Sequence, residues 1–186
     1  MAYPNSNLKK NMCEACQRGK QSRKYFPLKN RVSTSKPFKL LHLDLFGPSR
    51  TMSLGGNLYG LVVVDDYTRY TWTLFLHKKK DAYSEFKKLA RKLQNMCCSN
   101  IGAIRSDHGG EFQNEKFISF CKKLRISHNF STPRTPQQNG VVERKNMSLE
   151  KLARTILNDY GLPKCLWVDA VSTACYVMNK VLIRPI

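Results

Sequence analysis

Apolar and polar side chains alternate through residues 40–46, which read LLHLDLF. Leu41, Leu43 and Leu45 fall on one face of an extended chain, and Asp44 falls on the other. A period of two is that of a β-strand, whereas apolar positions in a helix recur every three or four residues. This segment is therefore predicted to be a strand that buries its leucines and carries a carboxylate on the opposite face.

The apolar period then changes repeatedly along the chain. Strands are predicted at residues 40–46, 58–64, 70–76, 101–106 and 126–130, and helices begin near residues 81, 114, 140 and 163, with Asn114 as the N-terminal cap of the second helix. Buried positions of the last two helices are predicted to be Val142, Leu149, Leu152, Ile156, Tyr160, Leu166, Ala170, Val171, Ala174 and Val177. The order favours an α/β domain with a mixed five-stranded sheet and helices on both faces.

Charge separates the chain into two predicted regions. Lysine and arginine number 32 against 13 acids, and the formal net charge of +19 favours a polyanionic partner. Residues 1–36 hold nine basic residues and the single acid Glu14, without a strand or helix period, and are predicted to be a basic N-terminal arm. Residues 37–186 are predicted to form the folded domain.

The cysteines and the apolar stretches indicate the compartment. Seven cysteines, including the adjacent Cys97 and Cys98, fit no disulfide framework and indicate a reducing environment. No stretch approaches the roughly 18 uninterrupted apolar residues of a membrane span, and residues 1–11 lack a hydrophobic signal region. We expect an intracellular, soluble protein without a membrane partner.

Three acids stand where carboxylates can meet beside the sheet: Asp44 in the first strand, Asp107 after the fourth, and Glu143 at a helix start. Hard cations take oxygen ligands, and one carboxylate can bridge two metals, so the set suits two Mg²⁺ or Mn²⁺ ions. It favours metal-dependent phosphodiester chemistry on nucleic acid. Asp65 and Asp66 are instead predicted to be turn residues, because aspartate commonly bonds to nearby backbone.

Several polar residues near these acids could contact DNA, because amides and cations bind phosphates and base edges. The candidates are Gln137, Gln138, Asn139, Arg144 and Lys145. The alternative for each is an ordinary solvated loop or helix surface. Gly109 and Gly110 could allow a sharp turn and a close phosphate approach, or only a turn.

Four segments, LLHLDLFGP, VVVDDYTRYTW, IRSDHGGEF and TPQQNGVVERKN, resemble the integrases of copia-type retrotransposons, from about Cys13 to nearly the end of the chain. The resemblance implies a ribonuclease H-like fold and assigns Asp44, Asp107 and Glu143 as catalytic, Mg²⁺-binding acids. It also implies strand transfer of element DNA ends into double-stranded target DNA by a homo-oligomer. Such an enzyme would act in the nucleus after a cytoplasmic particle stage.

The pair Cys13 and Cys16, in CEAC, resembles half of the family's His-His-Cys-Cys zinc module. No histidine precedes Cys13 in this chain, and a structural zinc site needs four ligands, so zinc binding is not expected here. Because the resemblance also implies a further C-terminal domain, residues 37–186 are expected to be a catalytic core cut from a Gag-Pol-type polyprotein.

Two alternatives remain open. A ribonuclease H-type nuclease of the same fold would take an acid from the first helix, where Glu85 is available, although the motif around Glu143 argues against it. An inactive or domesticated relic that only binds DNA could also retain the three acids.

Overall fold

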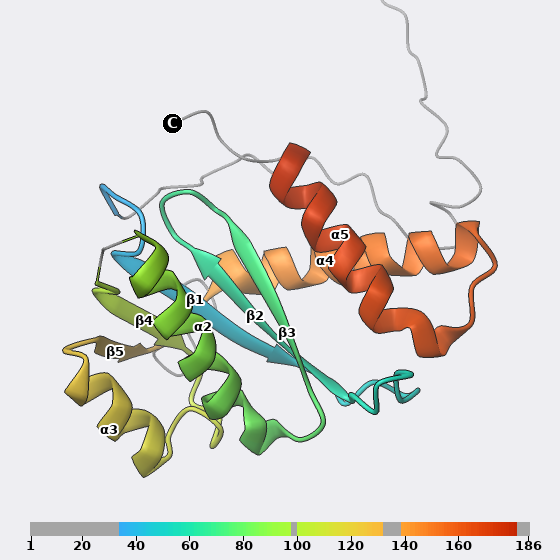
Figure 1. The fold of residues 1–186 in the computed structure, drawn as a ribbon. Coiled ribbons are helices and arrows are strands. Elements are labelled where there is room, and N and C mark those ends of the chain that lie inside the picture. Colours follow the sequence, from blue (N-terminus) through green and yellow to red (C-terminus); the bar gives the residue numbers. More distant parts are fainter. Residues whose placement is uncertain (1–33, 98–99, 132–138, 182–186) are drawn as a thin grey trace, which may run out of the picture.

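The structure is a computed structural model, and it describes residues 34–97, 100–131 and 139–181 (Figure 1). Its strands are β1 (Leu40–Phe46), β2 (Tyr59–Asp65), β3 (Thr71–Leu76), β4 (Ala103–Ser106) and β5 (Ser127–Phe130). Its helices are α2 (Ala82–Cys97), α3 (Glu115–Lys123), α4 (Gly140–Asp159) and α5 (Trp167–Val181), with short 3₁₀ turns η1 (Lys79–Asp81) and η3 (Lys164–Leu166). The predicted order of strands and long helices is confirmed. The predicted arm lies almost wholly outside the described residues.

The five strands form one mixed sheet in the order β3-β2-β1-β4-β5. β1 lies at its centre, antiparallel to β2 and parallel to β4, while β2 and β3 are antiparallel and β4 and β5 are parallel. Parallel strands need a crossover connection, and α2 and α3 supply these connections before β4 and β5. The C-terminal ends of β1 and β4 therefore lie at the same edge of the sheet.

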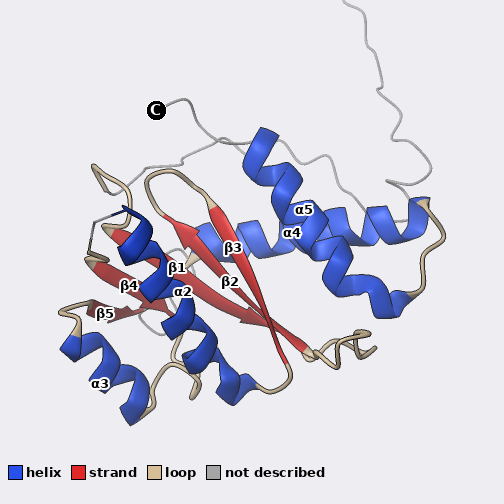
Figure 2. Ribbon diagram, in the orientation of Figure 1, coloured by secondary structure: helices blue, strands red, loops and turns tan. Residues whose placement is uncertain are grey.

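Helices cover both faces of the sheet, as predicted (Figure 2). One core joins the leucine face of β1 to α2 and α3, and includes Leu41, Leu43, Phe86 and Phe117. The other core joins β2 to α4 and α5 through residues such as Val62, Val64, Val142, Leu149 and Ala174. Because side chains alternate along a strand, Asp44 is directed toward the α4 side while the leucines beside it face α2.

Two predicted core positions are wrong. Tyr160 is 74% exposed and Val177 is 40% exposed. Tyr160 is the residue that caps α4 at its C-terminal end, so it lies beyond the stripe that faces the sheet. In α5 the buried side includes Cys175 and Met178, which places Val177 on the outer side of the same helix.

The predicted turn role of Asp65 and Asp66 agrees with their contacts. Asp65 accepts hydrogen bonds from the backbone N–H groups of Phe38 and Thr68, both at 2.8 Å. Asp66 lies 3.0 Å from Nε2 of the buried His42. Both acids are buried, so they organise the chain around the β2–β3 turn.

The N-terminal cap of α3 is also the predicted one. The side chain of Asn114 accepts a hydrogen bond of 2.9 Å from the backbone N–H of Phe117, which satisfies a free donor of the first turn. In the described part of the chain, no helix is long and apolar enough to cross a membrane.

Candidate active site

Asp44 lies in the central strand and is half-buried. Its Oδ2 accepts a hydrogen bond of 2.9 Å from the Nδ2 of Asn146 in α4. Burial raises the pKa of Asp44, the bond from Asn146 opposes this shift, and the nearby charges of Asp107 and Glu111 raise the pKa further. Asp44 is therefore held against α4 among other acids.

Asp107 follows directly after β4 and is exposed. The parallel pairing aligns Leu40 with Ala103 and His42 with Arg105, an offset of 103 − 40 = 63 positions. The same offset, continued for two residues, brings Asp107 beside Asp44. Asp107 Oδ1 accepts a hydrogen bond of 3.1 Å from the backbone N–H of Gly109, which orients the carboxylate at the strand end.

Glu143 lies in the first turn of α4. Its pKa is raised first by burial, then by the charges of Asp44 and Asp107, while the neighbouring guanidinium of Arg144 lowers it. The charge of Asp107 thus acts on both Asp44 and Glu143, and the charge of Asp44 also acts on Glu143. The parallel register of β1 and β4, together with the packing of α4 on the sheet, brings the set together.

The donor chemistry of this acid cluster fits a divalent cation. Its ligands would be carboxylate oxygens, which Mg²⁺ prefers, and their mutual repulsion is what a cation relieves. Within the residues described, however, no group of three or more His, Cys, Asp or Glu side chains is arranged to hold a metal ion. The acids are electrostatic neighbours without a preformed coordination geometry.

Three further polar residues lie at this site and were not predicted from the sequence. Asn146 lies three residues after Glu143 and is 8% exposed, although its Oδ1 has no hydrogen-bond partner. Glu111 acts on Asp44 by its charge. Burial raises the pKa of Glu150, and Asp44 contributes to the same shift. Asn146 could have been found from the sequence, because it is a polar amide at a position of α4 where the helical spacing predicts an apolar, buried residue.

The candidate DNA contacts lie in different environments. Arg144 is exposed beside Glu143, in keeping with a phosphate contact. Asn139 is only 2% exposed, and its Oδ1 is also unpartnered. Lys145 is half-buried, and its pKa is lowered by burial and affected by the charges of Cys175 and Arg69, so it lies toward α5. Their roles in DNA binding stay predictions.

The remaining predicted site residues are Gln137, Gln138, Cys13 and Cys16, and all four lie outside the described residues.

At the glycine pair, neither Gly109 nor Gly110 has the positive φ that would require glycine. A Cβ added at Gly109 would lie 2.7 Å from the carboxyl carbon of Glu111, whereas Gly110 has nothing within 4 Å. The open space at Gly110 therefore supports access rather than a special turn conformation.

A β3-β2-β1-β4-β5 sheet, with α2 and α3 on one face and α4 and α5 on the other, defines a ribonuclease H-like fold. This fold is similar to that of a chain in the cryo-EM structure of a simian T-cell lymphotropic virus intasome in complex with PP2A regulatory subunit B56 gamma. The TM-score is 0.63 at 22% sequence identity, over 78% of this chain and 49% of that chain.

The family model for the integrase core domain matches residues 34–136, and the chain belongs to this family. The matched region contains Asp44 and Asp107, while Glu143 lies beyond it. The family predicted from the four sequence motifs is thereby confirmed.

Similar proteins include retrovirus-related Pol polyproteins from transposons. The polyprotein of transposon TNT 1-94 of Nicotiana tabacum is 34% identical over 171 residues, which is 90% of this chain. Those of RE2 and RE1 of Arabidopsis thaliana are 34% identical over 152 residues and 30% identical over 168 residues, covering 80% and 90% of this chain. The chain spans only 13%, 10% and 11% of the three relatives.

Proposed function

We propose that this chain is the catalytic core of a polynucleotidyl transferase that joins the 3′ ends of element DNA to target DNA. The observation that carries the proposal is the acid cluster: Asp44, Asp107 and Glu143 arrive from β1, the end of β4 and the start of α4, and the charge of Asp107 helps to raise the pKa of both Asp44 and Glu143. Perturbed carboxyls from separate elements at the end of a sheet are typical of catalytic sites.

Asp44, Asp107 and Glu143 would hold two Mg²⁺ or Mn²⁺ ions, which when bound supply charge neutralisation at phosphorus and activation of the oxygen nucleophile. In strand transfer that nucleophile is a DNA 3′-hydroxyl, and in end trimming it is water. The protein's own task is to bring these three carboxylates together beside the central strand.

Two neighbours support this task. Asn146 limits the rotation of the Asp44 carboxylate by its hydrogen bond and favours the ionised form. Arg144 stands exposed next to Glu143, where its fixed positive charge suits a phosphate oxygen of the substrate. Asn139, Gln137, Gln138 and Lys145 remain further proposed DNA contacts.

The wider setting of the proposal rests on the resemblance to copia-type integrases, which the relatives support. The Pol polyproteins named above favour a copia-type retrotransposon as the source and a Gag-Pol-type polyprotein as the parent chain. The partner would be double-stranded DNA, bound by a homo-oligomer in the nucleus after a cytoplasmic particle stage. No zinc is expected at the pair Cys13 and Cys16 in this chain, because the pair supplies only half of a four-ligand set.

A joining assay tests the proposal and its nearest rival together. With branched DNA as substrate, Glu143→Gln should abolish Mg²⁺- or Mn²⁺-dependent joining, because the amide keeps the shape and removes the charge of a ligand. Glu85→Gln is the matched control. Glu85 pairs at 2.7 Å with Lys88 on the surface of α2, on the other face of the sheet from α4.

The same variants are then assayed for cleavage of an RNA–DNA hybrid. Hybrid cleavage that needs Glu85 and survives Glu143→Gln would contradict the proposal in favour of a ribonuclease H. A chain that binds DNA but joins none, even when supplied with its polyprotein flanks, would be the inactive relic.

A further inference from the structure

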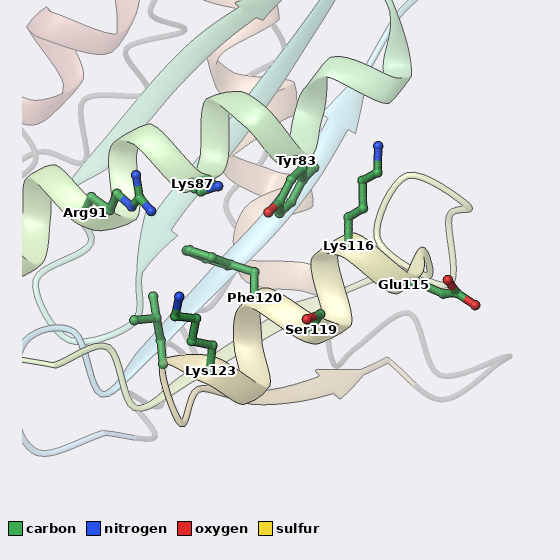
Figure 3. Close-up of a pocket in the computed structure, with 9 residues that line it drawn as sticks. Tyr83, Lys87, Arg91, Glu115, Lys116, Ser119, Phe120 and Lys123 are labelled. Carbon is green, nitrogen blue, oxygen red and sulfur yellow. The ribbon is translucent and has the colours of Figure 1, made fainter.

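A basic groove runs between α2 and α3, on the face of the sheet opposite α4. It has a volume of about 410 Å³, and Tyr83, Lys87 and Arg91 of α2 face Lys116, Phe120 and Lys123 of α3 across it (Figure 3). One acid, Glu115, also lines the groove, and its side chain points away from Arg91 and Lys123 (Figure 3).

The four cations of this groove are not neutralised by the protein. Among the described residues, none of Lys87, Arg91, Lys116 and Lys123 forms an ion pair with a carboxylate, whereas the neighbouring Lys88 is paired with Glu85. Lys87 instead has its ammonium 5.6 Å from the ring centroid of Tyr83, a cation–π contact that leaves the charge available. Unpaired cations facing one another across a groove favour a bound anion.

The spacing of the cations suits a row of phosphates. Lys87 and Arg91 are four residues apart, which is about 6 Å along a helix, and Lys116 and Lys123 are seven residues apart, which is about 10 Å. The charges are thus spread along both walls and do not surround one point. A single small anion would use only part of such an arrangement, whereas a nucleic-acid backbone presents phosphates at regular intervals.

The groove continues toward the acid cluster. A second hollow, of about 910 Å³, shares Tyr83, Glu115 and Lys116 with the first and extends to Gly110 and Glu111. Glu111 is one of the acids whose charge raises the pKa of Asp44. Lys79, Lys80 and Lys116 line this second hollow together with Asp81, Glu111 and Glu115. Its positive and negative charges therefore balance, and the excess of positive charge lies in the first hollow.

We propose that the α2–α3 groove is a second DNA-binding surface, which holds the phosphate backbone of a duplex whose path passes the acid cluster. The inference rests on the proposed function in one respect, namely that the partner is DNA. It requires neither metal binding nor any of the three catalytic acids. In a joining reaction, such a surface would hold DNA some distance from the bond that reacts.

The test compares two triple variants of the full chain that remove the same charge. The groove variant is Lys87→Gln, Arg91→Gln, Lys123→Gln, and the control is Lys88→Gln, Lys92→Gln, Lys122→Gln. Each removes two cations from α2 and one from α3. Binding to a fluorescent DNA duplex of unrelated sequence is measured without divalent metal over a range of salt concentrations.

The groove variant should flatten the slope of log affinity against log salt by about 0.9 for each phosphate that it no longer binds, and the control should change it clearly less. Removal of the Lys87–Tyr83 interaction could impair folding, so a second comparison changes only exposed side chains. Its groove variant is Lys116→Gln with Lys123→Gln, and its control is Lys92→Gln with Lys122→Gln. The Lys116→Gln, Lys123→Gln variant should flatten the salt slope more than its control does.

Equal slopes for groove and control variants, with wild-type binding and joining intact, would overturn the groove assignment alone. A wild-type chain that binds no duplex would overturn the proposed function as well. Binding to polyglutamate is measured as well. If the groove variant loses polyglutamate binding but keeps its duplex binding, the groove binds an acidic protein segment, and the proposal is overturned.

Discussion

Asn146 donates a hydrogen bond of 2.9 Å to Asp44, a residue 102 positions earlier in the chain. The bond links the central strand to α4, so the helix that carries Glu143 is tied directly to the first acid of the cluster. Because it lowers the pKa of a carboxyl that burial raises, Asn146 is a positioning residue as well as a structural one.

Replacing Asn146 with leucine should impair the site more than the fold. The Asn146→Leu variant keeps a similar volume at a buried position and loses the bond to Asp44. We expect DNA joining to fall about 10- to 100-fold, the range for residues that orient metal ligands. The pKa of Asp44 should rise, so Mn²⁺ affinity should decline at a higher pH than in the wild type.

Mn²⁺ titrations across pH distinguish this role from simple destabilisation, which would not move the pH midpoint. Ser148→Ala, at an exposed position of the same helix, is the control and should change neither quantity. An unaltered midpoint in Asn146→Leu would contradict the positioning role.

Without metal, Glu143 should destabilise the fold at neutral pH. Its folded-state pKa is raised by burial and by Asp44 and Asp107, so ionisation is less favourable in the folded than in the unfolded chain. Stability should therefore increase as pH falls through the raised pKa. Glu143→Gln should increase the free energy of unfolding at pH 7 by about 0.5 to 1 kcal/mol.

Urea unfolding in a chelating buffer measures this effect. Glu115→Gln is a matched control, because Glu115 also lies in the first turn of a helix, where an acid is favoured by the helix dipole. That variant should be slightly less stable than the wild type. Addition of Mg²⁺ should stabilise the wild type more than Glu143→Gln, and the reverse order would argue against Glu143 as a ligand.

His128 should make the fold sensitive to acid. Its Nε2 lies 3.0 Å from the hydroxyl of Ser106, whose own proton is donated to the carbonyl of Asp107, while the buried Nδ1 has no partner. Burial lowers the pKa of His128 from 6.5 to about 4, because a proton on Nδ1 would be buried without an acceptor.

The folded chain thus binds fewer protons at His128 than the unfolded chain between these two pH values. The stabilisation is fully present above pH 6.5 and is lost as pH falls toward 4, at no more than about 1.4 kcal/mol per pH unit. His128→Phe keeps a ring between Phe117 and Phe130 and removes the titration. Unfolding measured from pH 7 to 4 should be less pH-dependent in this variant, and equal pH dependence would contradict the assignment.

Deletion of residues 1–36 should weaken non-specific duplex binding and reduce its dependence on salt. This segment holds nine basic residues, and each phosphate that the chain no longer binds reduces the slope of log affinity against log salt by about 0.9. Anisotropy titrations of the truncated and full chains provide the comparison. An unchanged slope would mean that the segment does not contact DNA.

Much of the fold could be predicted from local patterns. The alternation of leucines in β1 predicted its bounds, and Asn114 was identified as a helix cap because a single side chain and a nearby N–H decide that feature. Strand ends were predicted less accurately, since β2 and β4 begin one and two residues later than expected. Strand pairing determines those ends, and it depends on residues distant in sequence.

The sequence by itself determined the order of elements, the positive charge and the three acids of a familiar motif set, because these depend on residue types and short spacings. Only the tertiary structure decided that Asn146 would contact Asp44, that Lys145 would turn toward α5, and that unpaired cations of α2 and α3 would line one groove. Each of these depends on how a helix is rotated against its neighbours. The rotation of a helix is set by the packing of the whole core, and it cannot be predicted from the spacing of residues within one segment.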